Sequence, residues 1–298
     1  MSILLFNPDS DPALASQLTR LLDAQAGVLE QRRFPDGESY LRVHTECKGR
    51  RCVILCNLFH PDERLLRLLF LADTLREMGA AEVGLITPYL AYMRQDKRFK
   101  PGECVTSRPF ARLLSQAFDY LVTVDPHLHR YHSLDEIYSI PSRVVQAAPL
   151  IAQWIGQHIR DPLLIGPDSE SEQWVSHVAS LAGAPFQILQ KERRGDYDVS
   201  ISLPDLEQGQ TCTPVLVDDI ISSGRTMLET LTHLNAAGLP RATIIGVHGI
   251  FAGDAYTRLT QVADVVTTAC IPHLSNQIDI APPIAEAVRE LMHARDND

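Results

Sequence analysis

Two adjacent carboxylates at the end of an apolar run are the most specific chemical feature of this sequence. Asp218 and Asp219 follow residues 215–217, and a turn rich in hydroxyl groups and glycine comes next, at residues 222–226. Glycine allows close backbone approach, and free N–H groups at a helix start favour an anion, so this turn suits a phosphate group. The carboxylates could accept hydrogen bonds from sugar hydroxyl groups or assist a metal ion. The alternative is a capped helix after an acidic turn.

A second group of polar residues follows the apolar run 83–87. It consists of Arg94, Gln95, Asp96 and Lys97. An arginine here suits phosphate pairing or stacking, and a glutamine suits the amide edge of adenine. Taken alone, these four residues are also compatible with an ordinary charged loop.

Two further apolar runs lead into residues that suit a metal ion. His127 follows the run 120–124, and Asp168 follows the run 163–165. A neutral imidazole beside carboxylates can bind Mg²⁺ or its waters, although oxygen ligands are more usual for this ion. His129 and His132 could complete a transition-metal cluster, but solvated surface histidines are the commoner use of such loose spacing. Asp168 could instead cap the helix that follows it.

Short β-branched runs alternate with stretches of helical periodicity, which is typical of a parallel sheet with helices on its faces. The predicted strands are residues 52–56, 83–87, 120–124, 163–165, 215–217, 243–247 and 265–268. The predicted helices include residues 62–78, 172–182 and 226–237. Parallel α/β sheets bind ligands at the carboxyl ends of their strands, and each polar group described above follows such an end.

The repetition of this scheme predicts two similar α/β domains, residues 1–145 and 146–298, with a tight junction near residues 141–149. The chain has 298 residues and a formal net charge of −10, which argues against nucleic acid as its main partner. Its start lacks a basic flank and a cleavage pattern, and no stretch approaches a membrane-spanning length. We therefore expect a cytoplasmic protein with a small-molecule ligand and no membrane partner. Six scattered cysteines, without a C-x-x-C pair, predict reduced thiols.

The turn after Asp219 resembles the phosphoribosyl pyrophosphate loop shared by type I phosphoribosyltransferases and ribose-phosphate pyrophosphokinases. The resemblance implies two phosphoribosyltransferase-like domains, each a mostly parallel sheet flanked by helices. It also implies that the loop holds the 5-phosphate of ribose 5-phosphate, with the acidic pair on the ribose 2- and 3-hydroxyls. The expected sugar-binding residues are Asp218, Asp219, Ser222, Ser223, Gly224, Arg225 and Thr226. Arg225 stands where a small residue is common.

Two segments distinguish the two families. Residues 88–97 resemble the proline-tyrosine and arginine-glutamine-aspartate-lysine segment of ribose-phosphate pyrophosphokinases, and residues 34–38 resemble their early phenylalanine and acidic loop. In that family the two segments bind ATP from neighbouring subunits, which implies at least a dimer. The expected ATP contacts are Phe34, Asp36, Gly37, Glu38, Arg94, Gln95, Asp96, Lys97 and His127.

The same family implies a metal and a catalytic flap. His127 and Asp168 match residues linked to Mg²⁺, although Pro126 replaces the usual leucine and Ser169–Ser171 replaces a glycine-containing stretch. Lys191 and Arg193 match a lysine-x-arginine step on a flap over the transferring phosphates. Without the resemblance, residues 191–196 would be interpreted as a solvated charge cluster before a hairpin that ends near Ile201.

The implied reaction moves the terminal diphosphate of ATP onto the 1-hydroxyl of ribose 5-phosphate, giving phosphoribosyl pyrophosphate and AMP, with Mg²⁺ as cofactor. The resemblance covers about residues 30–290, including a strand end at residues 247–251. Two alternatives remain open: a phosphoribosyltransferase, which would not require ATP, and a non-catalytic homologue that binds nucleotide and regulates a true synthase. Retention of both Lys191 and Arg193 argues against the second.

Overall fold

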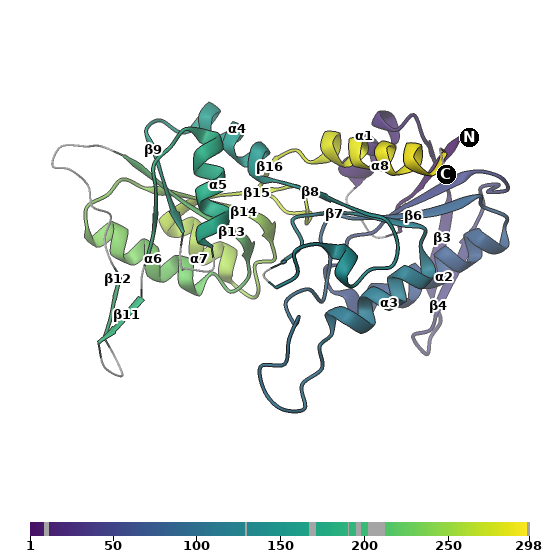
Figure 1. The fold of residues 1–298 in the computed structure, drawn as a ribbon, viewed down its shortest axis with the longest axis horizontal. Helices are drawn as coiled ribbons and strands as arrows, with labels where there is room; N and C mark the ends of the chain where they lie inside the picture. Colours follow the sequence, from purple (N-terminus) through teal and green to yellow (C-terminus); the bar gives the residue numbers. More distant parts are fainter. Residues whose placement is uncertain are drawn as a thin grey trace. The chain divides into compact units, whose positions relative to one another are not determined.

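The computed structural model describes the chain except residues 9–11, 129, 167–170, 190, 195–197, 202–211 and 297–298, and describes only the backbone of residues 191–194 and 198–201. The chain forms two α/β units. Unit 1 contains Met1–Val145 and Ala281–Asp298, and unit 2 contains Gln146–Ile280. Each unit has one parallel six-stranded sheet flanked by helices (Figure 1), which confirms the fold class expected from the alternating pattern.

The sheet of unit 1 has the strand order β2-β1-β5-β6-β7-β8, and every neighbouring pair is parallel. Its strands are β1 (Ile3–Phe6), β2 (Gln25–Ala26), β5 (Arg51–Leu55), β6 (Glu82–Thr87), β7 (Tyr120–Val124) and β8 (Ser142–Val145). Alternate residues of a strand face opposite sides. Phe6, Ile54 and Leu85 join a core cluster with α2 (Pro61–Glu77) and α3 (Ser107–Ala117). Helices α1 (Pro12–Leu21) and α8 (Ala281–Asp296) cover the other face (Figure 1).

Helix α2 agrees closely with the helix predicted at residues 62–78. Pro61 occupies the first turn, where a proline costs no helical hydrogen bond, and Asp62 and Glu63 complement the positive end of the helix dipole. After the helix, Gly79 has φ 82°, a backbone conformation that glycine adopts easily.

The sheet of unit 2 has the strand order β10-β9-β13-β14-β15-β16 and is also parallel throughout. Its strands are β9 (Pro162–Gly166), β10 (Phe186–Ile188), β13 (Thr213–Ile221), β14 (Ala242–Gly249), β15 (Ala263–Thr268) and β16 (Asn276–Ile278). Helices α6 (Arg225–Ala236) and α7 (Ala255–Val262) cover the face that contains Ile165, Leu216 and Ile244. Helices α4 (Ala148–His158) and α5 (Glu172–Ala182) lie on the opposite face (Figure 1).

Two short ribbons and one turn of helix complete the described structure. The antiparallel strands β3 (Leu29–Arg33) and β4 (Ser39–Val43) form a hairpin that extends away from the sheet of unit 1 (Figure 1). In unit 2, β11 (Lys191–Arg194) pairs antiparallel with β12 (Asp198–Ile201). A 3-10 turn, η1, spans Leu134–Glu136.

The C-terminal helix corrects the expected domain limits. The sequence pattern placed residues 146–298 in the second domain, but α8 belongs to unit 1. The reason is its buried apolar face, which includes Ile284, Val288 and Leu291 and packs in unit 1, where α8 contacts α1, β7 and β8. A helical pattern shows which face of a helix is buried, but it does not show which sheet that face covers.

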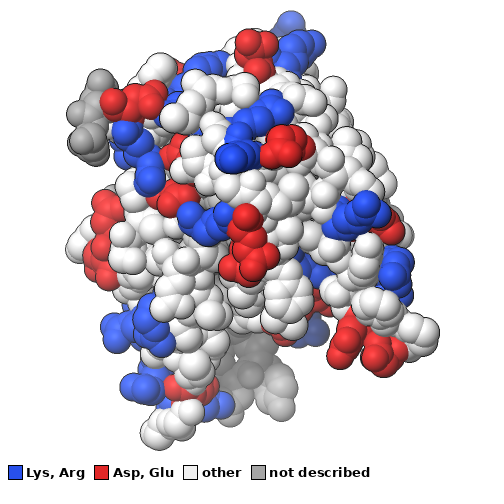
Figure 2. Space-filling model, turned by 90° about the vertical axis from the view of Figure 1, so that its right-hand side faces the viewer, with Lys and Arg blue, Asp and Glu red and all other residues white. Residues whose placement is uncertain are grey.

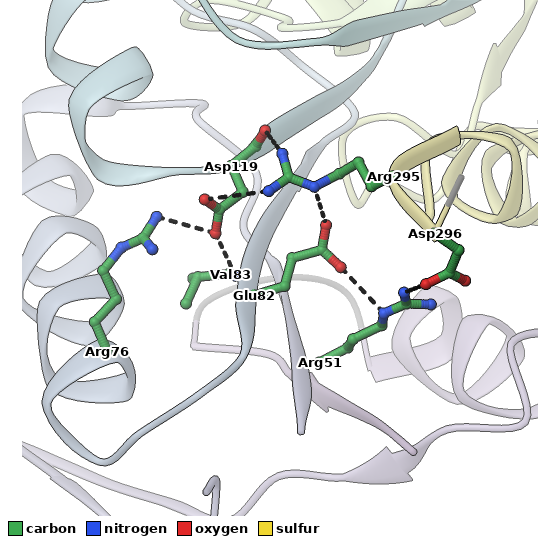
Figure 3. A network of polar contacts seen from close by, with 7 residues as sticks. All are labelled: Arg51, Arg76, Glu82, Val83, Asp119, Arg295 and Asp296. Atoms are coloured by element: carbon green, nitrogen blue, oxygen red, sulfur yellow. Dashed lines mark hydrogen bonds and ion pairs between the residues drawn. The ribbon is translucent and has the colours of Figure 1, made fainter. Parts of the chain in front are cut away.

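Polar contacts fix the end of α8 to the sheet of unit 1 (Figure 3). Arg295 Nε lies 2.8 Å from Glu82 Oε1, and its Nη1 donates to the carbonyl oxygen of Asp119 at 2.9 Å. Arg51 pairs with Glu82 at 3.3 Å and also with Asp296. Arg51, Glu82 and Asp119 lie at the amino ends of β5, β6 and β7, so this network occupies the edge opposite the carboxyl ends of the strands.

No helix in the part of the chain that the structure describes is long and apolar enough to span a membrane. On the face drawn in Figure 2, Lys and Arg side chains are interspersed with Asp and Glu.

Candidate functional site

The acidic pair and the glycine turn lie together at the carboxyl end of β13, in the middle of the sheet of unit 2. The strand includes Asp218 and Asp219, both half-buried, and Asp219 N donates to Asp218 Oδ1 at 3.0 Å. Gly224 precedes the first residue of α6 and has φ 66°. Because glycine has no side chain that could cap the helix, the first amide groups of α6 are suited to an anion. Phosphate binding by this turn stays a prediction, and the geometry is compatible with it.

Gly224 is required for two separate reasons. Its positive φ favours glycine, and a Cβ atom at this position would lie 3.0 Å from Leu259 Cδ1 on α7. Ser222 and Thr226 are half-buried, while Ser223 and Arg225 are exposed. The expected sugar-binding residues of this turn therefore form one continuous segment with solvent-accessible groups.

Residues 250–252, which the sequence pattern linked only to a family resemblance, support the turn. The amides of Ile250 and Phe251 both donate to the carbonyl oxygen of Ile221, at 2.9 and 3.0 Å, and Ala252 N donates to Ser222 O at 3.1 Å. Phe251 has φ 47°, and its ring contacts Tyr256 and His273. In the sequence, these residues are notable only because they follow the predicted strand 243–247. Their hydrogen bonds to Ile221 and Ser222 are long-range main-chain contacts, which leave no local sequence pattern.

The segment expected to bind nucleotide leaves the carboxyl end of β6 in unit 1. Arg94 and Lys97 are exposed, Gln95 is half-buried, and Asp96 is buried. At the start of the segment Tyr92 has φ 61° and donates its hydroxyl hydrogen to Asp62, a hydrogen bond that raises the pKa of Tyr92 to about 12. Arg94 and Lys97 are thus exposed to solvent on a segment that is held near its start by the hydrogen bond between Tyr92 and Asp62.

Asp96 differs from its neighbours because its carboxylate contacts Arg130. Arg130 Nη1 donates to Oδ1 and Oδ2 of Asp96 at 2.9 and 3.0 Å. The resemblance grouped Asp96 with the ATP contacts, but the structure places its side chain against another part of unit 1.

His127 lies at the next strand end. It is half-buried and follows β7, which pairs with β6 in parallel. Val124 N donates to Pro88 O at 3.3 Å, so the segments that contain His127 and Arg94 leave the sheet side by side. Asp125, with φ 31°, donates its amide hydrogen to Val145 O on β8 at 3.0 Å. The topology therefore brings together two of the expected nucleotide segments at one edge of the first sheet.

The early acidic loop forms the tip of the hairpin β3–β4. Gly37 has φ 93°, and Glu38 N donates to Asp36 Oδ1 at 3.1 Å. Phe34 is 38% exposed, and the Arg32 guanidinium lies 4.6 Å from its ring centroid and 4.1 Å from that of Tyr40. A cation over an aromatic face stabilises both side chains. The hairpin therefore presents a stacked, exposed aromatic group beside two carboxylates.

Several expected site residues have no described side chain. Asp168 and His129 lie outside the residues that the structure describes. Lys191 and Arg193 are in β11, of which only the backbone is described, and the strand is the first half of the hairpin that ends at Ile201. The sequence pattern had placed these charges before the hairpin, whereas they form its first strand.

The donor chemistry is compatible with Mg²⁺. Among the residues that the structure describes, no group of three or more His, Cys, Asp and Glu residues is arranged to hold a metal ion. The cluster considered for His127, His129 and His132 stays a hypothesis, because His129 lies outside those residues. Mg²⁺ commonly keeps several waters and uses one or two protein ligands with substrate phosphates, so it does not need such a cluster. His127 at the end of β7 fits this limited requirement.

Two parallel α/β units, one with an acidic pair and a glycine turn before a helix, define a two-domain protein of the phosphoribosyltransferase-like fold. Residues 3–117 match the N-terminal domain of ribose phosphate pyrophosphokinase, and residues 133–283 match the phosphoribosyl transferase domain. The curated ribose-phosphate pyrophosphokinase of Methanopyrus kandleri is 36% identical over 283 residues, which cover 93% of this chain and 96% of that protein. The chain belongs to the ribose-phosphate pyrophosphokinase family.

Two further comparisons agree with this assignment. The ribose-phosphate pyrophosphokinase of Methanothermobacter thermautotrophicus is 34% identical, with 93% of this chain and 96% of that protein covered. The crystal structure of phosphoribosylpyrophosphate synthetase from Mycobacterium smegmatis gives a TM-score of 0.85 at 26% sequence identity, and covers 99% of this chain and 100% of that chain. The similarity therefore extends through both units.

Proposed function

We propose that the protein is a ribose-phosphate diphosphokinase that transfers the β,γ-diphosphate of ATP to the 1-hydroxyl of ribose 5-phosphate. The observation that supports this proposal is that one chain has two different candidate sites. Unit 2 has the phosphate turn after Asp219, and unit 1 presents Arg94 and Lys97 beside the segment of His127. A phosphoribosyltransferase would need the phosphate turn of unit 2, but it would not need a site for a nucleoside triphosphate in unit 1.

The sugar phosphate is recognised by the turn after β13. The amides at the start of α6, with the hydroxyl groups of Ser222, Ser223 and Thr226, donate hydrogen bonds to the 5-phosphate, and Arg225 adds a positive charge. Asp218 and Asp219 accept hydrogen bonds from the ribose 2- and 3-hydroxyls. These contacts orient the sugar so that its 1-hydroxyl is the reacting group.

The nucleotide is recognised by groups from two copies of the chain. Arg94 and Lys97 pair with the phosphates, and the amide of Gln95 contacts the adenine edge. The hairpin tip of a second copy contributes Phe34, which stacks on the base, with Asp36, Gly37 and Glu38 around it. This arrangement requires at least a dimer for a complete site.

In the transfer step the oxygen of the ribose 1-hydroxyl attacks the β-phosphorus in line. A new oxygen–phosphorus bond forms, the bond between the β-phosphorus and the α,β-bridging oxygen breaks, and AMP leaves with that oxygen; the hydroxyl proton passes to solvent or to a phosphate oxygen. Lys191 and Arg193 offset the charge that develops on the β-phosphoryl and bridging oxygens. His127 and Asp168 would hold Mg²⁺, whose charge neutralises the phosphate oxygens when it is bound.

Phosphorus NMR of the purified protein with Mg²⁺, ATP and ribose 5-phosphate tests the proposal. We expect AMP and phosphoribosyl pyrophosphate to appear in equal amounts, and neither product to form without ATP. Formation of ADP would indicate simple kinase chemistry. Binding of ATP without any turnover, over a range of metal and phosphate concentrations, would support the non-catalytic homologue instead.

A further inference from the structure

Asp96 is a buried carboxylate in a segment that is otherwise exposed and basic. Arg94, Lys97, Arg98 and Lys100 are all exposed, whereas the side chain of Asp96 is 1% exposed. A buried carboxylate is costly unless a partner compensates its charge. The burial of this one residue among solvated cations therefore indicates a specific contact within unit 1.

Arg130 supplies that contact with good geometry. The same nitrogen, Nη1, lies 2.9 Å from one carboxylate oxygen of Asp96 and 3.0 Å from the other. The guanidinium also lies 5.6 Å from the ring centroid of Phe99, in the same segment as Asp96. Arg130 is itself 37% exposed in its side chain, so the pair connects a buried anion to a partly solvated cation.

The residue after Arg130 holds the main chain at the same point. Tyr131 donates its hydroxyl hydrogen toward the carbonyl oxygen of Asp96 at 3.4 Å, and its oxygen lies 3.2 Å from the hydroxyl oxygen of Ser107. Ser107 N in turn lies 3.4 Å from the Gln95 carbonyl oxygen. Two consecutive residues of one loop thus bind both the side chain and the backbone of Asp96.

These contacts join the two segments that leave neighbouring strands of the first sheet. The Pro88–Val124 hydrogen bond connects the segments at their roots, and the Asp96–Arg130 pair connects them further out. Arg94 and Lys97 flank Asp96 closely in the chain, and His127 lies three residues before Arg130. The two segments that carry these three side chains are therefore joined by the Asp96–Arg130 ion pair and by the hydrogen bond from Tyr131 to Asp96 O.

From this geometry we infer that the Asp96–Arg130 pair is a clamp that positions the polyphosphate-binding side chains, and that Asp96 is a positioning residue rather than a nucleotide contact. The inference rests on the proposed function, because it assigns the polyphosphate of ATP to this edge of unit 1. The clamp also neutralises Asp96, which would otherwise repel the phosphates that Arg94 and Lys97 attract.

Isothermal titration of Mg·ATP into the full-length protein, without ribose 5-phosphate, tests the clamp with four variants: Arg130→Gln, Arg130→Lys, Asp96→Asn and the Arg130→Gln/Asp96→Asn double variant. We expect Arg130→Gln and Asp96→Asn each to raise the Kd for Mg·ATP by about tenfold, and Arg130→Lys to raise it less. Because both residues act through one pair, the double variant should resemble either single variant rather than show the product of their effects. Arg143→Gln, which removes an exposed ion pair with Glu290 in the same unit, is the control and should leave the Kd unchanged.

Three results would overturn the inference: a Kd within twofold of the wild type in Arg130→Gln, losses that multiply in the double variant, or a loss confined to the Arg130 variants, which would place Arg130 on the nucleotide itself. Absence of Mg·ATP binding by the wild type would overturn it as well. Circular dichroism and thermal unfolding confirm that each variant is folded. If Arg130→Gln is unstable, Arg130→Lys, which keeps a positive charge, replaces it in the comparison. If the wild type binds Mg·ATP but forms no AMP, the proposed reaction fails while these Kd ratios still decide the clamp.

Discussion

Arg295, at the end of the last helix, lies 2.8 Å from Glu82, a buried carboxylate at the start of β6. More than two hundred residues separate them in the chain. Through this contact and the apolar face of α8, the C-terminal residues complete the unit that contains the N-terminus. The stability of unit 1 should therefore depend on Arg295 and Asp296, at the end of α8.

Replacement of Arg295 by glutamine should lower the free energy of unfolding by about 2 kcal/mol. Loss of one partner leaves a buried charge less well compensated. The cost is moderated here because Arg51 still pairs with Glu82 and because Arg295 is partly exposed. Arg143→Gln removes an exposed pair that also involves α8, and should cost less than about 1 kcal/mol. Chemical unfolding followed by circular dichroism measures both. Equal losses of unfolding free energy in the two variants would show that the contact with Glu82 contributes no more than an exposed ion pair.

The loss in Arg295→Gln should depend on pH. Burial raises the pKa of Glu82, and Arg295 and Arg51 counteract this in part. A carboxyl group whose pKa is raised on folding contributes stability at pH values below its ordinary pKa of about 4.3. This contribution is lost as the pH rises through the raised pKa of the folded state. Without Arg295 the pKa of Glu82 rises further, so the variant should lose more stability at about pH 8 than at about pH 5. An Arg295→Gln/Glu82→Gln double variant should lack this difference, and its persistence there would contradict the assignment to Glu82.

The hydroxyl group of Tyr120 offers a prediction of the opposite sign. Tyr120 is fully buried, and within the described residues its hydroxyl oxygen has no hydrogen-bond partner. A buried polar group without a partner is destabilising, so Tyr120→Phe should be neutral or stabilise the protein by up to about 1 kcal/mol. Tyr138→Phe provides a second test of the same kind, since its hydroxyl oxygen is also buried without a partner among those residues. A clear loss of thermal stability in Tyr120→Phe would mean that a bound water satisfies the hydroxyl group.

Much of the sheet architecture could be predicted from the sequence because strand and helix periodicities are local. The helix predicted at residues 62–78 is α2, and the run 215–217 lies within β13, with the acidic pair at its carboxyl half. The assignment of the C-terminal helix was wrong because Ile284 and Val288 would satisfy a sheet in either unit. Only tertiary contacts decide between them.

The site was predictable to the same limit. The turn at Gly224 could be recognised because a positive φ and a helix start both leave a local signature. The burial of Asp96 against Arg130 could not, because an acid in a basic segment gives no indication of a partner from another loop. The support of Ile221 by Phe251 was missed for a related reason, since main-chain hydrogen bonds are independent of side-chain type.

Gly224→Ala should weaken ribose 5-phosphate binding selectively. An alanine would be strained at φ 66°, and its Cβ atom would press on Leu259, so the turn must shift. We expect the KM for ribose 5-phosphate to rise at least about tenfold while the KM for ATP stays within about twofold. Gly238→Ala is the matched control, because Gly238 also has a positive φ, 76°, but nothing lies near its Cβ position. Steady-state kinetics with each substrate varied in turn measures both constants, and equal effects in the two variants would exclude a specific role of the turn.

Lys191→Ala should lower kcat about a hundredfold or more and change both KM values little. The ammonium group is proposed to interact with charge that develops only in the transition state, and loss of such an interaction lowers kcat rather than substrate affinity. Arg194→Ala removes a neighbouring charge of the same strand β11 and should reduce kcat less than about threefold. Rates of AMP formation at saturating substrates, with isothermal titration of Mg·ATP, separate the two effects. A Lys191→Ala enzyme with normal kcat and a raised Kd for Mg·ATP would assign Lys191 to ground-state binding, and β11 would then serve capture of the nucleotide rather than the transfer step.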